Sequence, residues 1–415
     1  MKKRKRIFTL ATFPVENKIV FVRVDYNVPL AEAKTRHKRK SSIKVKENTK
    51  IKASLPTIKY LLQKNCTIIL ATHLGRPEGK YVQELKVDPL AEELKKLLPN
   101  EKITKLPDCI GKEIQEKIAN AKPKQIFLLE NLRFYKEEEQ NNPAFAHSLA
   151  SLVDVYVNDA FAVSHRKHAS VHAITQFLPA LPGINMEKEI IYLQKALHPQ
   201  KPAVWIMGGA KLNKIDLLNQ ALKKADYILI GGALAFAFLK AQNYSIGMSK
   251  TDLQSMATAK KMLKKRNVKK RIILPLDFVV ADSFSQRAKT RIVRYNQITN
   301  HDIGLDVGPA TIELFKHYLR KAHTIVWNGP LGYFEWAQFA AATKEIGRFL
   351  GQLTATTICG GGETAEAITK FHLEHKITHL STGGGATLDF LSGKTLPGIW
   401  ALEKNYTKYR KKTFV

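Results

Sequence analysis

The sequence lacks an apolar run long enough to cross a bilayer, and it contains few cysteines. The longest apolar run, residues 227–239, is interrupted by glycines and is typical of a buried strand followed by a helix. Cys66, Cys109 and Cys359 are odd in number and lie far apart, which argues against a disulfide framework or a zinc site. Residues 1–14 begin with basic residues but have neither the apolar stretch nor the cleavage site of a signal peptide. We therefore expect a cytoplasmic protein with no part in a membrane.

Acidic residues are scarce relative to basic ones, with 36 Asp and Glu against 67 Lys and Arg and a net charge of +31. A basic surface attracts nucleic acids, anionic membranes or acidic small molecules. No zinc-finger or RNP motif accompanies the charge, so we favour a lysine-rich solvated surface that helps to capture anionic substrates, with nucleic acid as the alternative. Residues 31–50 are polar, basic and without period, and we expect a flexible excursion there.

The length of 415 residues exceeds that of most single hydrophobic cores, so two domains are expected. Short β-type runs alternate with helical patterns in both halves, which predicts an α/β fold with parallel sheets. An amphipathic helix in the middle of the chain separates the halves. We expect domains at residues 1–185 and 200–402, joined by a connecting helix at residues 186–199.

Basic side chains follow the predicted strands of the first half. In open α/β sheets, ligands gather at the carboxyl ends of strands, so these side chains should share one edge with the polar Asp25 and Asn27. A small, highly anionic molecule is the ligand that fits them. The basic residues in question are Arg23, His73, Arg76, Arg133, His165 and Arg166.

Glycines follow the predicted strands of the second half. Residues 208–211 read Gly-Gly-Ala-Lys, and the triplets at 360–362 and 383–385 each lead directly into a helical pattern. Glycine lets a ligand approach the backbone, and the start of a helix offers unpaired N–H groups that suit phosphate. We interpret this half as nucleotide-binding and expect it to face the anion-binding half across a cleft.

Two further patterns resemble a histidine metal site and a phosphate-binding P-loop, but the sequence around each does not favour that function. His165, His168 and His172 have no cysteine or carboxylate at a matching spacing, so a metal site is disfavoured. Residues 392–395 read Ser-Gly-Lys-Thr, but Leu388 stands where a P-loop needs its first glycine.

Taken together, the motifs resemble those of the phosphoglycerate kinase family over residues 22–402. The matching blocks lie at residues 23–29, 73–77, 129–133, 158–161 with 165–166, 208–211, 304–309, 327–332 with 334–335, 360–362 and 381–385. The resemblance implies two Rossmann-like domains with parallel sheets that close by hinge bending, with the tail 403–415 packing back on the first domain. It also implies reversible phosphoryl transfer between 1,3-bisphosphoglycerate with MgADP and 3-phosphoglycerate with MgATP, by a monomer.

The resemblance further implies roles for individual residues. Those that would hold the phosphoglycerate are Asp25, Asn27, His73, Arg76, Arg133 and Arg166. Those that would line the ATP or ADP site are Gly209, Lys211, Gly232, Asn328, Glu335, Gly362 and Thr364, with Glu335 at the ribose. Glu363 would face Mg²⁺, and catalysis would rest on Lys50, Lys211 and the backbone of Gly361, Gly384 and Gly385.

The sequence departs from the family pattern at several of these positions. Lys50 stands where the family has a catalytic arginine, so the charge remains but the planar two-pronged donor is lost. Glu363 replaces the aspartate that faces magnesium. Lys214 follows Lys211 one residue sooner than usual, and Ala162 and Ala233 replace glycines near the ligands.

Two alternatives to an active kinase follow from these features. The basic residues 31–50 and the net charge are compatible with a weakly active, kinase-like protein that binds RNA or another polyanion. Lys50 and Glu363 are compatible with a homologue that binds nucleotide without catalysis.

Overall fold

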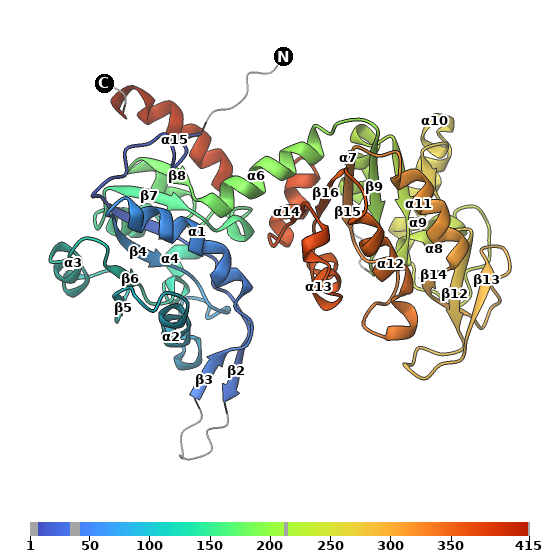
Figure 1. Cartoon of the computed structure of the whole chain (residues 1–415), viewed down its shortest axis with the longest axis horizontal. Helices are drawn as coiled ribbons and strands as arrows, with labels where there is room; N and C mark the ends of the chain where they lie inside the picture. The colour runs from blue at the N-terminus through green and yellow to red at the C-terminus, as the bar shows by residue number, and fades with distance from the viewer. Residues whose placement is uncertain (1–6, 34–41, 211–214, 414–415) are drawn as a thin grey trace. The chain divides into compact units, whose positions relative to one another are not determined.

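The computed structural model describes residues 7–33, 42–210 and 215–413 and forms two compact units (Figure 1). Unit 1 comprises Met1–Ile190 and Thr395–Val415, and unit 2 comprises Ile191–Lys394. Within the described ranges, no helix is both long enough and apolar enough to cross a membrane.

Unit 1 is built on a six-stranded parallel sheet in the order β5-β6-β4-β1-β7-β8. Its central strands read IVFVR and TIILA and are almost entirely buried, as expected for a sheet covered on both faces. The strands are β1 (Ile19–Arg23), β4 (Thr67–Ala71), β5 (Ile103–Lys105), β6 (Ile126–Leu128), β7 (Val155–Asn158) and β8 (Ala180–Pro182). The helices are α1 (Thr49–Gln63), α2 (Asp88–Leu97), α3 (Lys112–Ala119), α4 (Lys136–Glu139), α5 (Pro143–Ala150) and α15 (Pro397–Thr413). The expected α/β architecture is confirmed.

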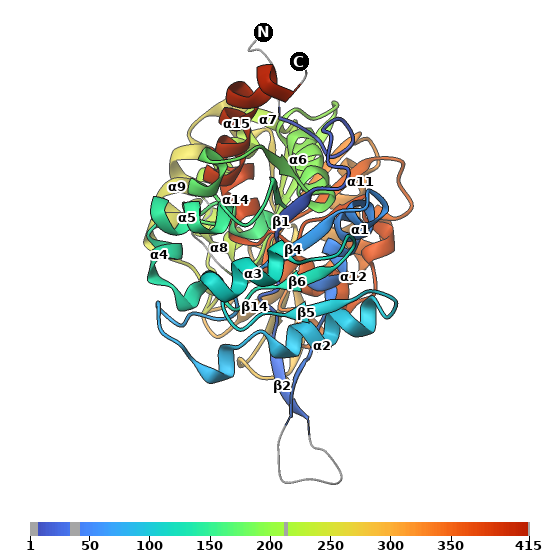
Figure 2. The same ribbon diagram turned by 90° about the vertical axis from the view of Figure 1, so that its left-hand side faces the viewer.

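The described ends of the basic segment 31–50 are ordered, which corrects the expectation of a flexible excursion. Strands β2 (Leu30–Ala33) and β3 (Ser42–Val45) pair as an antiparallel hairpin that projects from the sheet of unit 1 (Figures 1 and 2). Strands of four residues are too short to show a periodic pattern, and backbone pairing decides their structure. Residues 34–41, with Arg36 and Arg39, lie outside the described residues.

Unit 2 contains a second six-stranded parallel sheet, in the order β11-β10-β9-β15-β16-β17. Its strands are β9 (Ala203–Met207), β10 (Tyr227–Ile230), β11 (Ile272–Ile273), β15 (Thr324–Asn328), β16 (Thr356–Cys359) and β17 (His379–Leu380). Its helices are α7 (Ile215–Lys224), α8 (Gly232–Lys240), α9 (Leu253–Leu263), α10 (Arg266–Lys269), α11 (Pro309–Leu319), α12 (Ala341–Leu350), α13 (Gly362–Lys370) and α14 (Gly385–Leu391).

A three-stranded antiparallel sheet also belongs to unit 2 and was not predicted from the sequence. Strand β12 (Asp277–Ala281) pairs with β13 (Thr290–Arg294) on one side and with β14 (Ile303–Val307) on the other. All residues of β13 except Val293 are exposed, so this strand carries almost no hydrophobic pattern. The prediction that this half contains only parallel strands was therefore incomplete.

Helix α6 (Ile184–Leu197) contains the boundary between the units, and helix α15 returns the chain to unit 1. Asn405 of α15 is buried and bonds three backbone groups: its Nδ2 donates to the carbonyls of Thr175 and Leu178 at 2.7 and 2.9 Å, and its Oδ1 accepts from the Ala180 amide at 2.8 Å. One side chain of α15 thus provides hydrogen-bond partners for backbone groups of β8 and of the residues just before it.

The start of α6 is held by a buried carboxyl group. Asp159, in the loop after β7, accepts from the Met186 amide through Oδ1 at 3.1 Å, while its Oδ2 has no hydrogen-bond partner in the described part of the chain. Burial raises the pKa of this group to about 7.

We expect Asp159 to make the stability of unit 1 dependent on pH. Its folded pKa lies above its ordinary value of 3.8, so its stabilising contribution is complete below about pH 4 and is lost as the pH rises through 7. Asp159→Asn removes this dependence. Relative to wild type, the variant should gain on the order of 3 kcal/mol between about pH 4 and about pH 8. Urea unfolding followed by circular dichroism at both pH values measures it, and exposed Asp282 offers the control Asp282→Asn. Equal pH slopes for Asp159→Asn and wild type would contradict the assignment.

Candidate active site

The polar side chains expected at the sheet edge of unit 1 follow strands that are neighbours in its sheet. Strands β6, β4, β1 and β7 are adjacent and parallel, so their carboxyl ends form one edge. Asp25 and Asn27 follow β1, His73 and Arg76 follow β4, Arg133 follows β6, and Arg166 follows β7. Sequence reasoning placed these residues correctly relative to the sheet.

Lys50 joins this edge from the first turn of α1. Its Nζ lies 2.8 Å from Asp25 Oδ2 and 3.2 Å from the Asn27 carbonyl oxygen. Asn27 in turn accepts from the Gly75 amide through Oδ1 at 3.0 Å, which connects the loops after β1 and β4. No acidic residue occupies the first turn of α1, so Asp25 supplies the negative charge next to this ammonium.

His73 is buried beside cationic groups and is held as a neutral ring. An Arg23 guanidinium nitrogen lies 3.3 Å from His73 Nδ1, and because arginine can only donate, Nδ1 is the acceptor. Burial, and then the charges of Arg23 and Arg133, hold the His73 pKa well below its usual range. The proton of the neutral ring is therefore on Nε2, and His73 can donate one hydrogen bond to an anion.

Arg133 is buried and incompletely paired. Its Nη1 donates to the Gly75 carbonyl at 2.8 Å, and its Nε lies 3.2 Å from Glu139 Oε1. Its Nη2 has no hydrogen-bond partner in the described ranges. Burial, together with the nearby Arg166 and Arg23, lowers the Arg133 pKa to about 10, so the group remains charged at neutral pH. An anionic ligand would provide the missing acceptor.

A buried network behind this edge was missed by sequence reasoning. Ser170 Oγ accepts from Arg23 Nε at 2.8 Å and donates to Glu138 Oε1 at 2.6 Å, while the Ser170 amide donates to Glu138 Oε2 at 2.8 Å. Burial raises the Glu138 pKa and the charge of Arg23 opposes the shift. Arg23 is fully buried rather than part of a binding rim, and its position is fixed by Ser170 and Glu138. Residues 23, 138 and 170 are too far apart in the sequence for any motif to connect them.

The remaining residues of the edge differ in exposure. Arg76 is exposed, whereas Arg166 is half-buried and donates from Nε to His165 Nε2 at 3.3 Å. His168 lies 3.8 Å from Glu138, and burial followed by the nearby arginines lowers its pKa to about 3. His172 stacks on Trp400. Histidines 165, 168 and 172 thus have separate surroundings.

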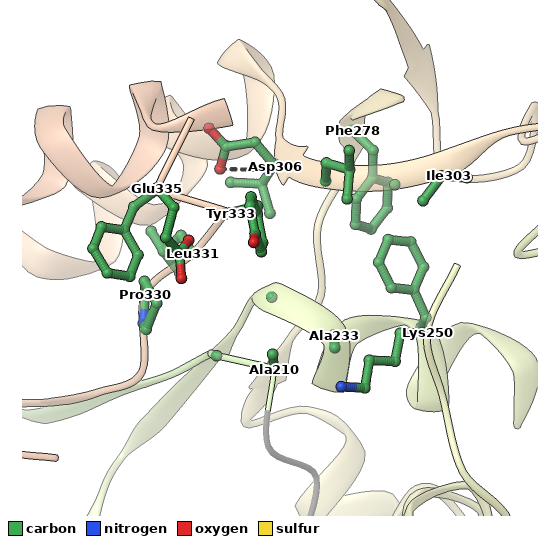
Figure 3. A pocket seen from close by; sticks show the side chains of 18 of the residues that line it. Ala210, Ala233, Lys250, Phe278, Ile303, Asp306, Pro330, Leu331, Tyr333 and Glu335 are labelled. Carbon is green, nitrogen blue, oxygen red and sulfur yellow. Dashed lines mark hydrogen bonds between the residues drawn. The ribbon is translucent and has the colours of Figure 1, made fainter. Parts of the chain in front are cut away.

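Unit 2 contains a cavity of about 430 Å³ near the carboxyl ends of β9 and β10 (Figure 3). Four of the residues predicted for nucleotide or metal line it: Gly209, Gly232, Glu335 and Glu363. Aromatic and aliphatic side chains form most of the remaining wall, which suits a flat base. The further lining residues include Ala233, Phe236, Met248, Lys250, Phe278, Phe284, Ile303, Asp306, Leu331 and Tyr333.

Several of these wall residues come from the antiparallel sheet and its loops, which explains why the sequence did not identify them. Phe278 lies on β12, Phe284 in the following loop, and Ile303 on β14. Asp306, also on β14, is fully buried, and its two oxygens accept from the amides of Val307 and Ala342. Burial raises its pKa to about 8.

Asn328 and Thr364 form hydrogen bonds with the backbone next to the glycine triplet 360–362, and neither lines the cavity. Asn328 Nδ2 donates to the Gly360 carbonyl at 2.7 Å, and Thr364 Oγ1 accepts from the Gly329 amide at 2.6 Å. Asn328 Oδ1 is buried and has no partner in the described part of unit 2. Lys211 and Lys214 lie outside the described residues.

Both glycine triplets precede helices, as predicted. Gly361 (φ 99°) precedes α13, and Gly384 (φ 52°) precedes α14, so each helix begins after a residue in a conformation that favours glycine. A side-chain carbon added at Gly362 or Gly384 would meet no atom within 4 Å, which shows open space over both helix starts. Gly362, Gly384 and Gly385 do not line the cavity of unit 2.

Comparison with known proteins agrees with this geometry. The family model described as phosphoglycerate kinase matches residues 10–394. Phosphoglycerate kinase of Moorella thermoacetica is 44% identical over 399 residues, covering 95% of this chain and 98% of the relative. The cytosolic phosphoglycerate kinase of Triticum aestivum is 44% identical over 414 residues, covering 97% and 100%. The solved phosphoglycerate kinase of Coxiella burnetii is 35% identical, with a TM-score of 0.85 over 96% of this chain and 99% of that one.

Proposed function

The chain belongs to the phosphoglycerate kinase family, and from this premise we propose how the residues of its two units share the reaction. The activity is that of a glycolytic phosphotransferase with a carboxyl group as acceptor, which uses ATP and ADP as substrates. It interconverts 1,3-bisphosphoglycerate with ADP and 3-phosphoglycerate with ATP.

Unit 1 holds the phosphoglycerate in this proposal. The acid carries a carboxylate and a phosphate, and the edge of unit 1 offers donors of matching charge. These are the unpaired Nη2 of Arg133, the Nε2–H of His73, and the guanidinium groups of Arg76 and Arg166. The observation that carries this assignment is the buried, incompletely paired Arg133 beside a neutral histidine, because a free anion satisfies both.

Unit 2 holds the nucleotide. The apolar wall of the cavity and the bare backbone at Gly209 and Gly232 suit the base, and Glu335 suits the ribose hydroxyls. Phosphates would meet the N–H groups at the start of α13, which lies beside the carboxyl end of β15. The predicted residues at these two ends are Asn328, Gly362 and Thr364. Lys211 remains part of the proposal by its place in the family motif.

Phosphoryl transfer requires alignment and compensation of the charge on the moving group. The backbone of Gly361, Gly384 and Gly385 would donate to its oxygens, and Lys50 would supply a cation from the side of the acid. The two bound molecules must meet in line, so hinge closure of the domains 1–185 and 200–402 about residues 186–199 is part of the proposal.

Magnesium fits the residues at the nucleotide site. The described residues contain no group of three or more His, Cys, Asp or Glu side chains that could hold a metal ion. Mg²⁺ in kinases is usually bound by phosphates, waters and one or two carboxylates, and Glu363, on the cavity wall in the first turn of α13, provides one. Bound there, it would neutralise phosphate charge.

We also propose that the protein acts as a monomer in the cytoplasm. The buried, unpaired cysteines Cys66, Cys109 and Cys359 suit a reducing compartment. The decisive experiment for the function as a whole is a coupled assay with 3-phosphoglycerate and MgATP. Turnover supports the proposal, and its absence with purified, folded protein would refute it.

Ser170→Ala tests the network behind the acid site. The change leaves Arg23 Nε and Glu138 Oε1 without their shared hydroxyl, so Arg23 is freed from the position in which it bonds His73. We expect KM for 3-phosphoglycerate to rise about tenfold, while KM for MgATP stays within about twofold. Exposed Ser151 provides the control Ser151→Ala, and Ser170→Thr should restore the hydroxyl and most of the affinity. A matched rise in both KM values would indicate general loss of structure instead.

A further inference from the structure

Lys50 is the one primary amine among the residues that we assign to the acid. The other cationic or hydrogen-donating side chains at this edge are those of Arg76, Arg133, Arg166 and His73. A guanidinium stays protonated in proteins and does not act as a nucleophile, whereas a lysine that loses its proton does. The lysine at position 50 therefore adds a nucleophile where the family pattern has an arginine.

The surroundings of Lys50 suit a nucleophilic amine. Its Nζ lies 2.8 Å from Asp25 Oδ2 and 3.2 Å from the Asn27 carbonyl oxygen, and within the described ranges it has no third hydrogen-bond partner. The side chain of Lys50 is 31% exposed, so a ligand can reach the amine. A carboxylate at hydrogen-bond distance is in position to accept the proton that the ammonium must lose before its nitrogen can attack.

One substrate of the proposed reaction is an electrophile of the kind that amines attack. 1,3-Bisphosphoglycerate is an acyl phosphate, in which C1 is joined to the transferring phosphoryl group through a single oxygen. Phosphoryl transfer to ADP breaks the bond between that oxygen and phosphorus, whereas attack at C1 breaks the bond between C1 and the same oxygen. Because Lys50 is proposed to lie beside the transferring group, its amine also lies close to C1.

We propose that Lys50 is a self-modification site, at which the bound acyl phosphate transfers its 3-phosphoglyceryl group to the lysine. Nζ forms an amide bond with C1 as the C1–O bond breaks, and the electron pair of that bond leaves with inorganic phosphate. Of the two protons that the ammonium loses, Asp25 passes one to water and the departing phosphate carries the other. The step needs no oxidant, reductant or further reactant. The inference rests on the proposed function, which places the acid beside Lys50.

This modification inactivates the enzyme. The amide is neutral, so the charge at position 50 is lost, and the attached phosphoglyceryl group occupies the site of the acid itself. Because bound reactants are held together, Lys50 should react at least about 10²-fold faster than the exposed Lys52 of the same helix. ADP consumes the acyl phosphate in the productive reaction, so the modification is expected when 1,3-bisphosphoglycerate accumulates while ADP is scarce.

The test incubates the protein with 1,3-bisphosphoglycerate prepared separately and, in parallel, with 3-phosphoglycerate and MgATP, from which the enzyme makes the compound itself. Samples are diluted, assayed for remaining turnover and mapped by peptide mass spectrometry. In wild type we expect remaining turnover to fall at least about tenfold as one 3-phosphoglyceryl group appears on Lys50. Lys50→Arg should stay within about twofold of its own starting rate, because its guanidinium is not acylated.

Two comparisons assign the reaction to the bound acid. Lys52→Arg changes a neighbouring exposed lysine and should lose turnover as wild type does. Excess 3-phosphoglycerate without nucleotide should protect Lys50 from the prepared compound, because both molecules occupy one site.

Three results would overturn the inference: an unlabelled Lys50 in a protein that turns over, equal labelling of Lys50 and Lys52, or an equal loss of turnover in Lys50→Arg. Absence of turnover in untreated wild type would refute the proposed function instead. Labelling of Lys50 by the separately prepared compound would then decide the inference by itself.

Discussion

Replacing Lys50 by alanine is expected to lower kcat by about 10²–10³ while the free energy of unfolding changes by less than about 1 kcal/mol. The loss in rate follows because a positioned cation that neutralises the transferring phosphoryl group contributes mainly in the transition state. The small effect on stability follows from two opposing terms: the variant loses a partly exposed ion pair with Asp25, but it also removes a cation from the first turn of α1.

The matched variants separate charge from geometry at this position. Lys50→Arg restores the two-pronged donor typical of the family and should equal or exceed the wild-type rate. Lys52→Ala changes an exposed lysine two residues further along the same helix and should leave kcat unaltered. Steady-state kinetics in both reaction directions, with urea unfolding as the measure of stability, provide the readout. A kcat for Lys50→Ala within about threefold of wild type would remove Lys50 from the mechanism.

Arg133→Met should raise the dissociation constant for 3-phosphoglycerate by about 10²–10³, because two charge-assisted hydrogen bonds are each worth roughly 1.5–3 kcal/mol. Binding of MgADP to unit 2 should remain within about twofold of wild type. In the free protein the arginine is buried with Nη2 unpaired, so its removal relieves a desolvation penalty that offsets the lost contacts to Gly75 and Glu139. The variant is therefore expected to fold as well as wild type.

Calorimetric titration with each ligand separates these effects, and exposed Arg266 of unit 2 gives the control Arg266→Met. If Arg133→Met bound 3-phosphoglycerate with wild-type affinity, the assignment of the acid to this edge of unit 1 would be wrong. A fall in affinity for both ligands together with a lower unfolding midpoint would show instead that Arg133 is needed for the fold.

The parts of the fold that the sequence predicted are those that bury both faces. Strands such as β1 and β4 are covered on both sides, so their apolar residues run without interruption and are recognisable one strand at a time. Strands β2, β3 and β13 are short or exposed, and only pairing with neighbours defines them. Local pattern cannot reveal a strand whose stability comes from a partner elsewhere in the chain.

The same distinction applies to the candidate sites. Residues placed directly after strands, such as His73 and Arg133, could be predicted because topology alone brings strand ends together. The full burial of Arg23 could not, since it depends on Ser170 and Glu138, which reach it only through tertiary packing.

The anchoring of α15 by Asn405 has a consequence for how the protein is made. Unit 1 is assembled from residues up to Ile190 and from residues after Lys394, so all of unit 2 is translated between its two parts. Domains generally fold as units while the ribosome is still elongating the chain. Unit 2 can therefore fold first although it begins later in the sequence. The β8 edge of unit 1 must wait until α15 has left the exit tunnel, because only then can Asn405 form its hydrogen bonds with the backbone there.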